Sequence, residues 1–331
     1  MRTCGPRLLC FNRIRHLHPH HAARLKKAAD ISRERSTGHF MTHRIGFIGL
    51  GMMGGPMAKR LLHAGLRFSV HNRTKSKAEP LIAEGAHWCD SPQAVAANSD
   101  IVFSMVSNPD ALRDVVLGSA GVLAGLKPGA IHIDTSTVSP EVIHDILEAY
   151  SPRGSSLLHA PVLGSVPQAT DGTLLMFAGG DDAAFQIAEP YLRLLTSRIW
   201  RFERPEQATH LKLICNLFIA GMIATLGEAL AFARNADVDQ STLLEIIGKS
   251  QLNSPMYQTK GASIIQDNFA PRFFLDHMLK DVNLMIEAGR SLQTPLPTIE
   301  LVQQMLVEAQ RSGLGHEDYS AVVKVLFKKG H

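Results

Sequence analysis

Ile45-Gly46-Phe47-Ile48-Gly49-Leu50-Gly51-Met52-Met53-Gly54 is the stretch that decides the fold of this 331-residue chain. Its apolar first half predicts a buried strand, and the GxGxxG glycine spacing predicts a tight turn into a helix. In such a turn Gly49 permits the sharp bend, Gly51 lets the backbone approach a pyrophosphate, and Gly54 allows close packing of helix and strand. The helix N-terminus adds free N–H groups for an anion. Residues 44–73 are therefore predicted to form a dinucleotide-binding βαβ unit.

The end of the next predicted strand indicates which dinucleotide is bound. His71-Asn72-Arg73-Thr74 carries no carboxylate where NAD enzymes place an Asp or Glu on the ribose hydroxyls. Arg73 can instead pair with a 2′-phosphate, to which Asn72 and Thr74 can donate hydrogen bonds. The alternative is an ordinary solvated basic turn, because further lysines follow. We expect NADP as the cofactor, with NAD possible.

From Arg44 to about Phe202, short apolar strands alternate with helical stretches, which is typical of an α/β fold with a doubly wound, mostly parallel sheet. The predicted strands are Ile45 to Gly49, Phe68 to Val70, Ile101 to Val106, Ile131 to Asp134, Leu157 to Val162, Leu174 to Ala178 and Ile199 to Phe202.

After Phe202 the pattern changes to long helices, which predicts an all-helical C-terminal domain. The predicted helices are Ala208 to Asn235, Ser241 to Lys249, Lys280 to Ser291 and Thr298 to Ser312. We expect three parts: residues 1–42 as a leader, 43–205 as the cofactor-binding domain, and 206–328 as the all-α domain for substrate and dimerisation.

The first 40 residues differ from the rest in charge. They hold nine Lys or Arg against Asp30 and Glu34, a net +7, which leaves −3 of the overall +4 for the remainder. Such a leader fits a transit peptide, or a metal-binding or nucleic-acid-binding tail. We favour upstream sequence or a disordered tail, because Met41 directly precedes the first predicted strand, and we therefore expect no nucleic-acid partner.

Composition limits which classes of protein and which kinds of partner are possible. With 45% hydrophobic and 19% charged residues the chain is typical of a globular protein. Its four cysteines form no CxxC pair, so we expect neither a metal site nor structural disulfides. The longest apolar run, Leu213 to Leu226, spans 14 residues and suits a buried core helix better than a bilayer. We expect a cytoplasmic protein with no membrane partner, or an organellar one if the leader is a transit peptide.

Catalytic candidates lie where strands end, because ligands of a doubly wound sheet bind at its carboxyl edge. Three segments with hydroxyl and backbone N–H groups follow predicted strands: Val106-Ser107-Asn108, Asp134-Thr135-Ser136-Thr137 and Ala160-Pro161-Val162-Leu163-Gly164-Ser165. Ser136 and Thr137 are equally suited to cap the helix that follows them.

Lys212 is the candidate acid–base group. It lies near the start of the long apolar helix, where burial would lower its pKa toward neutrality. Asn216 is four residues further on, on the same helix face, and can orient the ammonium or a substrate. The alternative is a surface lysine whose charged end reaches solvent.

Together these residues resemble the β-hydroxyacid dehydrogenase family, which includes 3-hydroxyisobutyrate dehydrogenase and the glyoxylate and succinic semialdehyde reductases. The resemblance runs from His43 to about Leu326. Five motifs carry it in order: Ile45 to Gly54, Asp134 to Thr137, Ala160-Pro161-Val162 with Asp171-Gly172-Thr173-Leu174, Lys212 with Asn216, and Lys280-Asp281.

The resemblance implies a Rossmann-type domain joined by the long helix to the helical domain, an active site between them, and a homodimer or homotetramer. It makes Lys212 the acid–base group and Asn216 its positioning partner, acting on a small hydroxy acid or semialdehyde. The implied cofactor contacts, together with those inferred above, are Gly49, Gly51, Met52, Met53, Asn72, Arg73, Thr74, Val106, Ser107, Thr137 and Lys280. The expected substrate contacts are Ser136, Leu163, Gly164 and Ser165.

The chain departs from the family pattern at Leu163, where the family usually has a serine that helps hold the substrate carboxylate. Either Ser165 supplies a replacement donor, or the pocket takes a less polar substrate. Smaller departures are His159, at a position that is often acidic, and Glu206, at a usual glycine.

Three rival functions follow from relatives of the same fold. Imine reductases of this type generally replace the lysine that is present here as Lys212. A non-catalytic, chromatin-associated relative would also lack it. 6-Phosphogluconate dehydrogenase, a further relative, has a longer C-terminal region than this chain can supply. We therefore expect an NADP(H)-dependent oxidoreductase.

Overall fold

The computed structural model of the chain describes residues 43–327, so the predicted leader lies outside the described residues. From His43 onward the chain forms one compact unit. Its first part is built on a sheet and its last part on helices, which confirms the predicted fold class.

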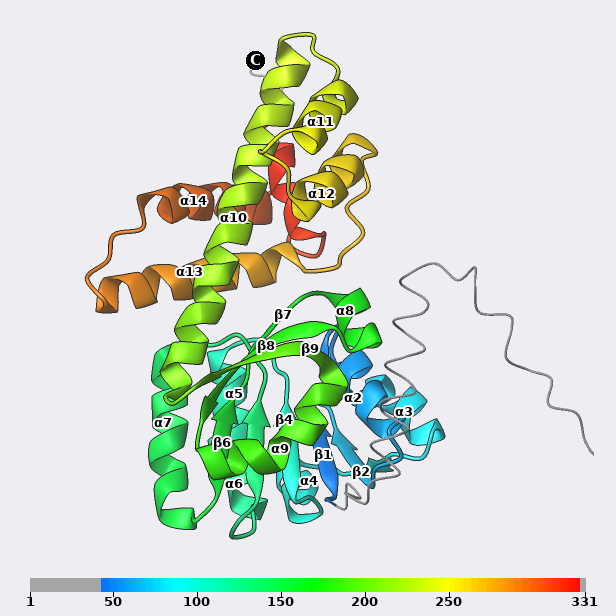
Figure 1. Cartoon of the computed structure of the whole chain (residues 1–331), viewed down its shortest axis with the longest axis vertical. Helices are drawn as coiled ribbons and strands as arrows, with labels where there is room; N and C mark the ends of the chain where they lie inside the picture. The colour runs from blue at the N-terminus through cyan, green and yellow to red at the C-terminus, as the bar shows by residue number, and fades with distance from the viewer. Residues whose placement is uncertain (1–42, 328–331) are drawn as a thin grey trace, which may run out of the picture. The chain divides into compact units, whose positions relative to one another are not determined.

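Within the described residues nine strands form one sheet in the order β3-β2-β1-β4-β5-β6-β8-β7, with β9 paired to β8 (Figure 1). The strands from β1 to β6 run parallel, in the order typical of a Rossmann sheet, whereas β8 runs antiparallel to β6 and β7. The strands are β1 (Ile45–Ile48), β2 (Phe68–His71), β3 (His87–Trp88), β4 (Ile101–Ser104), β5 (Ile131–Asp134), β6 (Ser156–His159), β7 (Val162–Leu163), β8 (Leu174–Gly180) and β9 (Thr196–Phe202).

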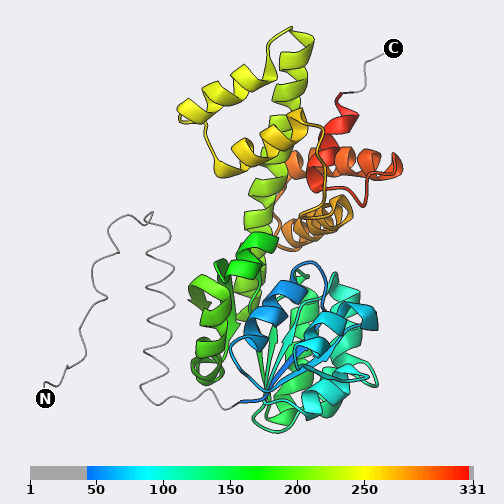
Figure 2. The same cartoon turned by 90° about the vertical axis from the view of Figure 1, so that its right-hand side faces the viewer.

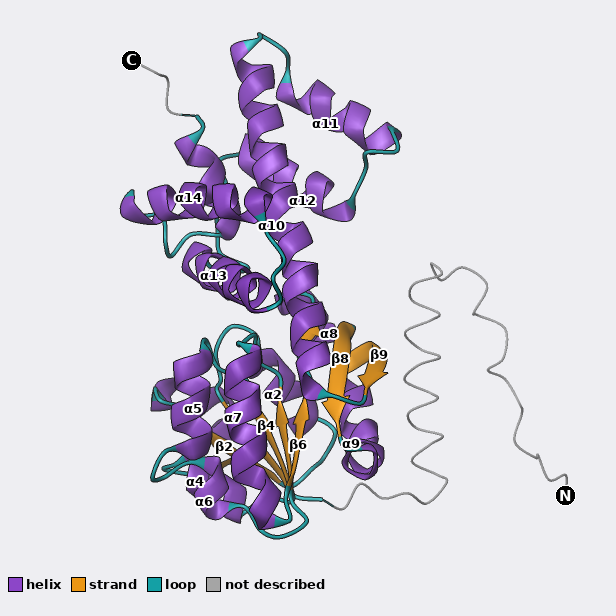
Figure 3. Cartoon of the chain, turned by 90° about the vertical axis from the view of Figure 1, so that its left-hand side faces the viewer, coloured by secondary structure: helices purple, strands orange, loops and turns teal. Residues whose placement is uncertain are grey.

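The central strands of this sheet are buried on both sides because helices cover both of its faces. In Figure 3 α9 lies on one side of the strands, and the layer containing α4, α5, α6 and α7 lies on the other. Leu112, Val142 and Ile146 form part of the core between α5 and α7. The helices of this part are α2 (Gly54–Leu62), α3 (Glu79–Ala83), α4 (Pro92–Ala97), α5 (Pro109–Leu117), α6 (Val122–Gly125), α7 (Pro140–Tyr150), α8 (Val166–Asp171) and α9 (Asp182–Leu195), with the short 3-10 turns η1 (Lys75–Lys77) and η2 (Ser151–Arg153).

The long helix α10 (Pro205–Asn235) connects the sheet to the C-terminal helices. It packs on α7 and on β6 to β9 near its start, and on α11 to α14 along the rest (Figures 1 and 2). Buried apolar residues of α10 to α14 share one core, in which Leu230 of α10 is fully buried. The other elements are α11 (Gln240–Lys249), α12 (Pro255–Ile265), α13 (Leu275–Ser291), α14 (Pro297–Arg311) and η3 (Tyr319–Val325).

In the described part of the chain α10 is also the one helix whose length and hydropathy would allow it to cross a membrane. Core helices of soluble proteins meet the same criterion, and 44% of the most apolar window of α10 is buried inside the fold.

One local prediction was wrong, and one alternative that the sequence left open is excluded. The single strand predicted from Leu157 to Val162 is two strands, β6 and β7, which pair with different parts of β8. The interruption falls at Pro161, whose nitrogen has no hydrogen to donate to a ladder. The helix α7 is capped by Ser139, whose hydroxyl accepts from the Val142 N–H, so Ser136 and Thr137 are not its caps.

Candidate active site

The glycine turn after β1 has the geometry of an anion cradle. Gly49 has a φ of +93°, and a Cβ there would lie 2.1 Å from the Met105 carbonyl oxygen. A Cβ on Gly54 would lie 1.9 Å from the Gly49 carbonyl oxygen, so neither position admits a side chain. Gly51 is exposed, and a Cβ there would meet no described atom within 4 Å. The open side of the turn therefore lies at Gly51, where a pyrophosphate can approach.

The start of α2 is suited to the same ligand. The helix follows the turn directly, with Met52 and Met53 half-buried in the bend. No described side chain caps it, so an anion can approach the helix start, although the Gly55 N–H already donates to the Gly51 carbonyl at 2.9 Å. The residues that the sequence assigned to the pyrophosphate thus fit a dinucleotide.

Asn72 joins this turn to the basic segment after β2. Its Oδ1 accepts from the Leu50 N–H at 2.8 Å, and its Nδ2 donates to the Thr74 carbonyl at 2.8 Å. Arg73 and Thr74 are exposed beside it. Asn72 therefore positions the glycine turn and the segment after β2 relative to each other, a function that the sequence did not predict for it.

Four predicted site residues from distant segments meet in one chain of hydrogen bonds and an ion pair. Lys212 Nζ donates to Asn216 Oδ1 at 2.9 Å, and Asn216 Nδ2 donates to Asp281 Oδ2 at 2.6 Å. Lys280 Nζ lies 2.6 Å from Asp281 Oδ1 and donates to the Thr137 carbonyl at 2.6 Å. The chain connects α10, α13 and the loop that follows β5.

Burial changes the proton affinity of Lys212. Its side chain is 8% exposed, and loss of solvation lowers its pKa from 10.5 to about 8, although the nearby Asp281 carboxylate acts to raise it. A lysine with such a pKa exchanges its proton near neutral pH and can act as acid or base. The alternative of a surface lysine is wrong.

Asp281 is a site residue that sequence reasoning missed. It was quoted in the Lys280-Asp281 motif, but no function was assigned to it. Its side chain is 2% exposed, on the face of α13 that also carries the buried Met278 and Leu284, three residues before and after it. A carboxylate on an apolar helix face was the available signal, because a buried charge requires a partner.

The Ser136 hydroxyl lies deeper than expected for a substrate contact. It is fully buried, donates to Asp134 Oδ1 at 2.8 Å and accepts from the Val106 N–H at 2.9 Å. Val106 is half-buried and Ser107 exposed at the neighbouring strand end. The structure thus brings the segments after β4 and β5 together, as predicted from their positions at one sheet edge.

The third strand-end segment runs from β7 into α8. Leu163 is half-buried, and Gly164 is exposed with a φ of +142°. Ser165 donates from both its hydroxyl, at 2.9 Å, and its N–H, at 3.0 Å, to Oε1 of Gln168. Its hydroxyl is therefore already engaged at the start of α8.

Comparison with known proteins covers both parts of the chain. Residues 44–202 match the family model for the NAD binding domain of 6-phosphogluconate dehydrogenase. Residues 207–326 match the model described as NAD-binding of NADP-dependent 3-hydroxyisobutyrate dehydrogenase.

Individual relatives extend this match. The chloroplastic glyoxylate/succinic semialdehyde reductase 2 of Arabidopsis thaliana is 33% identical over 86% of this chain and 80% of its own length. The human cytokine-like nuclear factor N-PAC is 33% identical over 85% of this chain, which spans about half (51%) of that relative. The crystal structure of 3-hydroxyisobutyrate dehydrogenase from Salmonella typhimurium has a TM-score of 0.78 at 29% identity, covering 85% of this chain and 99% of that one.

Proposed function

The chain belongs to the β-hydroxyacid dehydrogenase family, and from that premise we propose that it interconverts a small 3-hydroxy acid and its semialdehyde or oxo form with NADP(H), using Lys212 as the acid–base group. It is an NAD(P)-dependent oxidoreductase acting on hydroxyl groups, with NADP as its cofactor. The observation that carries the proposal is the chain from the buried Lys212 through Asn216 and Asp281 to Lys280, which reaches the carboxyl edge of the sheet.

NADP fits the residues present, because Gly51 faces open space at an uncapped helix start and Arg73 is an exposed cation at the end of β2. When bound, the cofactor donates or accepts the hydride. The residues that would hold it are Gly49, Gly51, Met52, Met53, Asn72, Arg73, Thr74, Val106, Ser107, Thr137 and Lys280.

The protein's own contribution is proton transfer at Lys212. In the reductive direction the Lys212 ammonium protonates the alkoxide that forms on the substrate, and in the oxidative direction the neutral amine removes the proton. Asn216 Oδ1 accepts a hydrogen bond from one N–H of the ammonium and leaves the other N–H groups for the substrate. Asp281 accepts from the Asn216 amide and thereby keeps its oxygen directed at Lys212.

The segment that we expect to contact the substrate, Leu163 to Ser165, is less polar than the corresponding segment of the family. Leu163 replaces a hydroxyl, and the Ser165 hydroxyl is bonded to Gln168. Ser165 therefore supplies a donor to the substrate only by leaving that partner. We propose that the exposed backbone at Gly164 faces the substrate, and that the pocket accepts an apolar substituent next to Leu163.

Two rival functions are less well supported. Imine reductases generally lack the lysine, and here Lys212 is buried and oriented by Asn216. A non-catalytic function, as considered for chromatin-associated relatives, would not require a lysine with a pKa lowered to about 8.

The experiment that tests the proposed function is oxidation of NADPH by the full chain against glyoxylate, succinic semialdehyde, longer keto acids and cyclic imines. We expect turnover of at least one semialdehyde or keto acid. Turnover of the cyclic imines alone would replace the proposal with imine reduction, and binding of NADPH without any turnover would favour the non-catalytic function.

We predict that Arg73→Ala raises the KM for NADPH about tenfold, the size expected for an exposed charge-assisted contact to phosphate, and leaves the KM for NADH nearly unchanged. Steady-state kinetics with the two cofactors checks this. Arg67→Ala is the matched control, because Arg67 is also exposed but precedes β2 at the opposite end. Equal effects of Arg73→Ala on both cofactors would reject the 2′-phosphate contact.

We further propose a homodimer or homotetramer, supported by large apolar side chains exposed on α10: Ile214 at 50%, Phe218 at 64% and Phe232 at 78%.

The division into domains at residues 205 and 206 and the cytoplasmic location stay predictions. The proposed division falls at the start of α10, which contacts both the strands and the C-terminal helices.

A further inference from the structure

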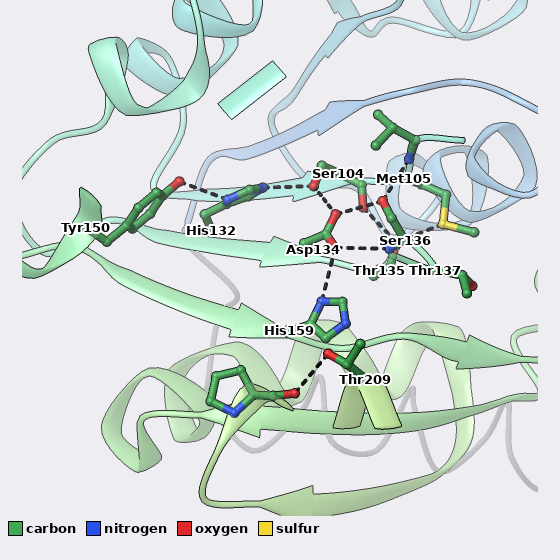
Figure 4. A network of polar contacts seen from close by, with 12 residues as sticks. Ser104, Met105, His132, Asp134, Thr135, Ser136, Thr137, Tyr150, His159 and Thr209 are labelled. Atoms are coloured by element: carbon green, nitrogen blue, oxygen red, sulfur yellow. Dashed lines mark hydrogen bonds and ion pairs between the residues drawn. The ribbon is translucent and has the colours of Figure 1, made fainter. Parts of the chain in front are cut away.

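A buried polar network lies beneath the carboxyl edge of the sheet. It is separate from the interactions that link Lys212, Asn216, Asp281 and Lys280. Figure 4 shows it running from Tyr150 on α7 across the ends of β4, β5 and β6. Each of its side chains is at most 2% exposed. Its members are Ser104, His132, Asp134, Ser136, Tyr150 and His159.

The hydrogen bonds in this network have a single consistent direction. The one hydroxyl proton of Ser104 goes to Asp134 Oδ1 at 2.6 Å, so Nε2 of His132, at 2.9 Å, must donate to the Ser104 oxygen. Burial lowers the pKa of His132 to about 4, so the ring is neutral and its Nδ1 accepts from the Tyr150 hydroxyl at 2.9 Å. This branch ends at the buried Tyr150, so it orients groups and offers no route for protons to solvent.

Asp134 is the centre of the network. Its Oδ1 accepts from the hydroxyls of Ser104 and Ser136, and its Oδ2 accepts from the Ser136 N–H at 3.3 Å and from His159 Nδ1 at 3.1 Å. Burial raises the pKa of Asp134, but the interactions with His159, His132 and Ser104 together hold the pKa below its usual value. The carboxylate is therefore ionised and oriented from several sides.

Ser136 consequently has no free proton for a substrate. Both its N–H and its O–H are directed at Asp134, and its oxygen accepts from the Val106 N–H. A substrate carboxylate needs a donor, which Ser136 cannot supply while it is held this way. The geometry suits a fixed support for the Val106–Ser107 turn.

His159 makes a hydrogen bond at only one of its two ring nitrogens. Nε2 of His159 is buried without a hydrogen-bond partner among the described residues, which is an unfavourable arrangement. The Asp134 contact at Nδ1 is the compensating interaction.

We propose that Asp134, oriented by His159, is a positioning residue that holds Ser136 beneath the Val106–Ser107 turn and thereby shapes the nicotinamide half of the cofactor pocket. The inference rests on the proposed function for the place of the cofactor at Val106 and Ser107. It assigns Ser136 to support of the cofactor site and not to the substrate carboxylate.

The test measures NADPH affinity by isothermal titration calorimetry for the full chain and its variants, well below their melting temperatures. Because this titration needs no carbonyl substrate, it is independent of which substrate the enzyme reduces. We expect Ser136→Ala to raise the Kd for NADPH about tenfold, the loss expected for one buried hydrogen bond. Where turnover is measured, the KM for the carbonyl substrate should change less than about twofold. Ser99→Ala is the matched control, because Ser99 is an equally buried serine bonded to the Val95 carbonyl before β4.

A pair of variants at His159 distinguishes an effect on the position of Asp134 and Ser136 from an effect on the stability of the fold. His159→Asn keeps an N–H donor close to the place of Nδ1 and should bind NADPH within about threefold of the wild type, whereas His159→Leu should match Ser136→Ala. A Ser136→Ala variant with unchanged Kd for NADPH and a raised substrate KM would overturn the proposal. So would a His159→Asn variant that folds and binds NADPH as weakly as Ser136→Ala, a comparison that stands even if His159→Leu does not fold.

Discussion

Replacing Lys212 with alanine should reduce turnover about 1,000-fold, within the range that a positioned acid–base group supplies. The change removes the buried amine whose pKa is lowered to about 8 and leaves the glycine turn and Arg73 untouched. Steady-state kinetics together with an NADPH titration measures both consequences. The Kd for NADPH should stay within about threefold, because the hydrogen bond of Lys212 goes to Asn216 and not to the cofactor turn.

The matched control is Lys249→Ala, which removes an exposed lysine paired with Glu245 at the end of α11. It should leave turnover unchanged. A Lys212→Ala variant that keeps most of its rate would refute Lys212 as the catalytic residue, and equal losses in turnover and NADPH affinity would assign it to cofactor binding.

The second large effect is expected at Asp281. Asp281→Ala removes the acceptor of the Asn216 amide and leaves Lys280 without its buried counter-charge, so we expect kcat to fall about 100-fold. Because the Asp281 carboxylate raises the pKa of Lys212, its loss should also lower that pKa further. The decline of the reductive rate at high pH should then begin at a lower pH than in the wild type.

Asp281→Asn separates charge from shape, because the amide oxygen can still accept from Asn216. It should retain more of kcat than the alanine variant and show the same direction of pH shift. Glu287→Gln, an exposed position on the same helix, is the control. If Asp281→Ala melted at a lower temperature but kept the wild-type kcat and pH profile, Asp281 would be a structural residue only.

The sequence predicted best what short spacings determine. The glycine turn is encoded within ten residues, and Lys212 and Asn216 share a helix face because they are four residues apart. The strand-end segments were placed at one edge by the parallel order of the sheet, and Ser136 does meet Val106 there.

What the sequence missed depends on contacts between distant segments. Asn216 and Asp281 are 65 residues apart, and nothing in either local pattern shows that α10 and α13 bring them together. His132 and His159 occupy ordinary strand positions, so their place around Asp134 became visible only in the assembled sheet. The helix α12 was missed altogether. Ser254 followed by Pro255 was the local signal that the prediction overlooked, and in the structure the Ser254 hydroxyl caps the helix by accepting from the Tyr257 N–H.

The chemistry at Lys212 is tested most directly by the pH dependence of kcat/KM in both directions for the wild-type protein. We predict that the reductive rate falls as pH rises through about 8, because the ammonium of Lys212 is lost, and that the oxidative rate rises over the same interval, because the neutral amine appears. Rates that stay level through this interval in both directions, under conditions where chemistry limits turnover, would contradict Lys212 as the acid–base group.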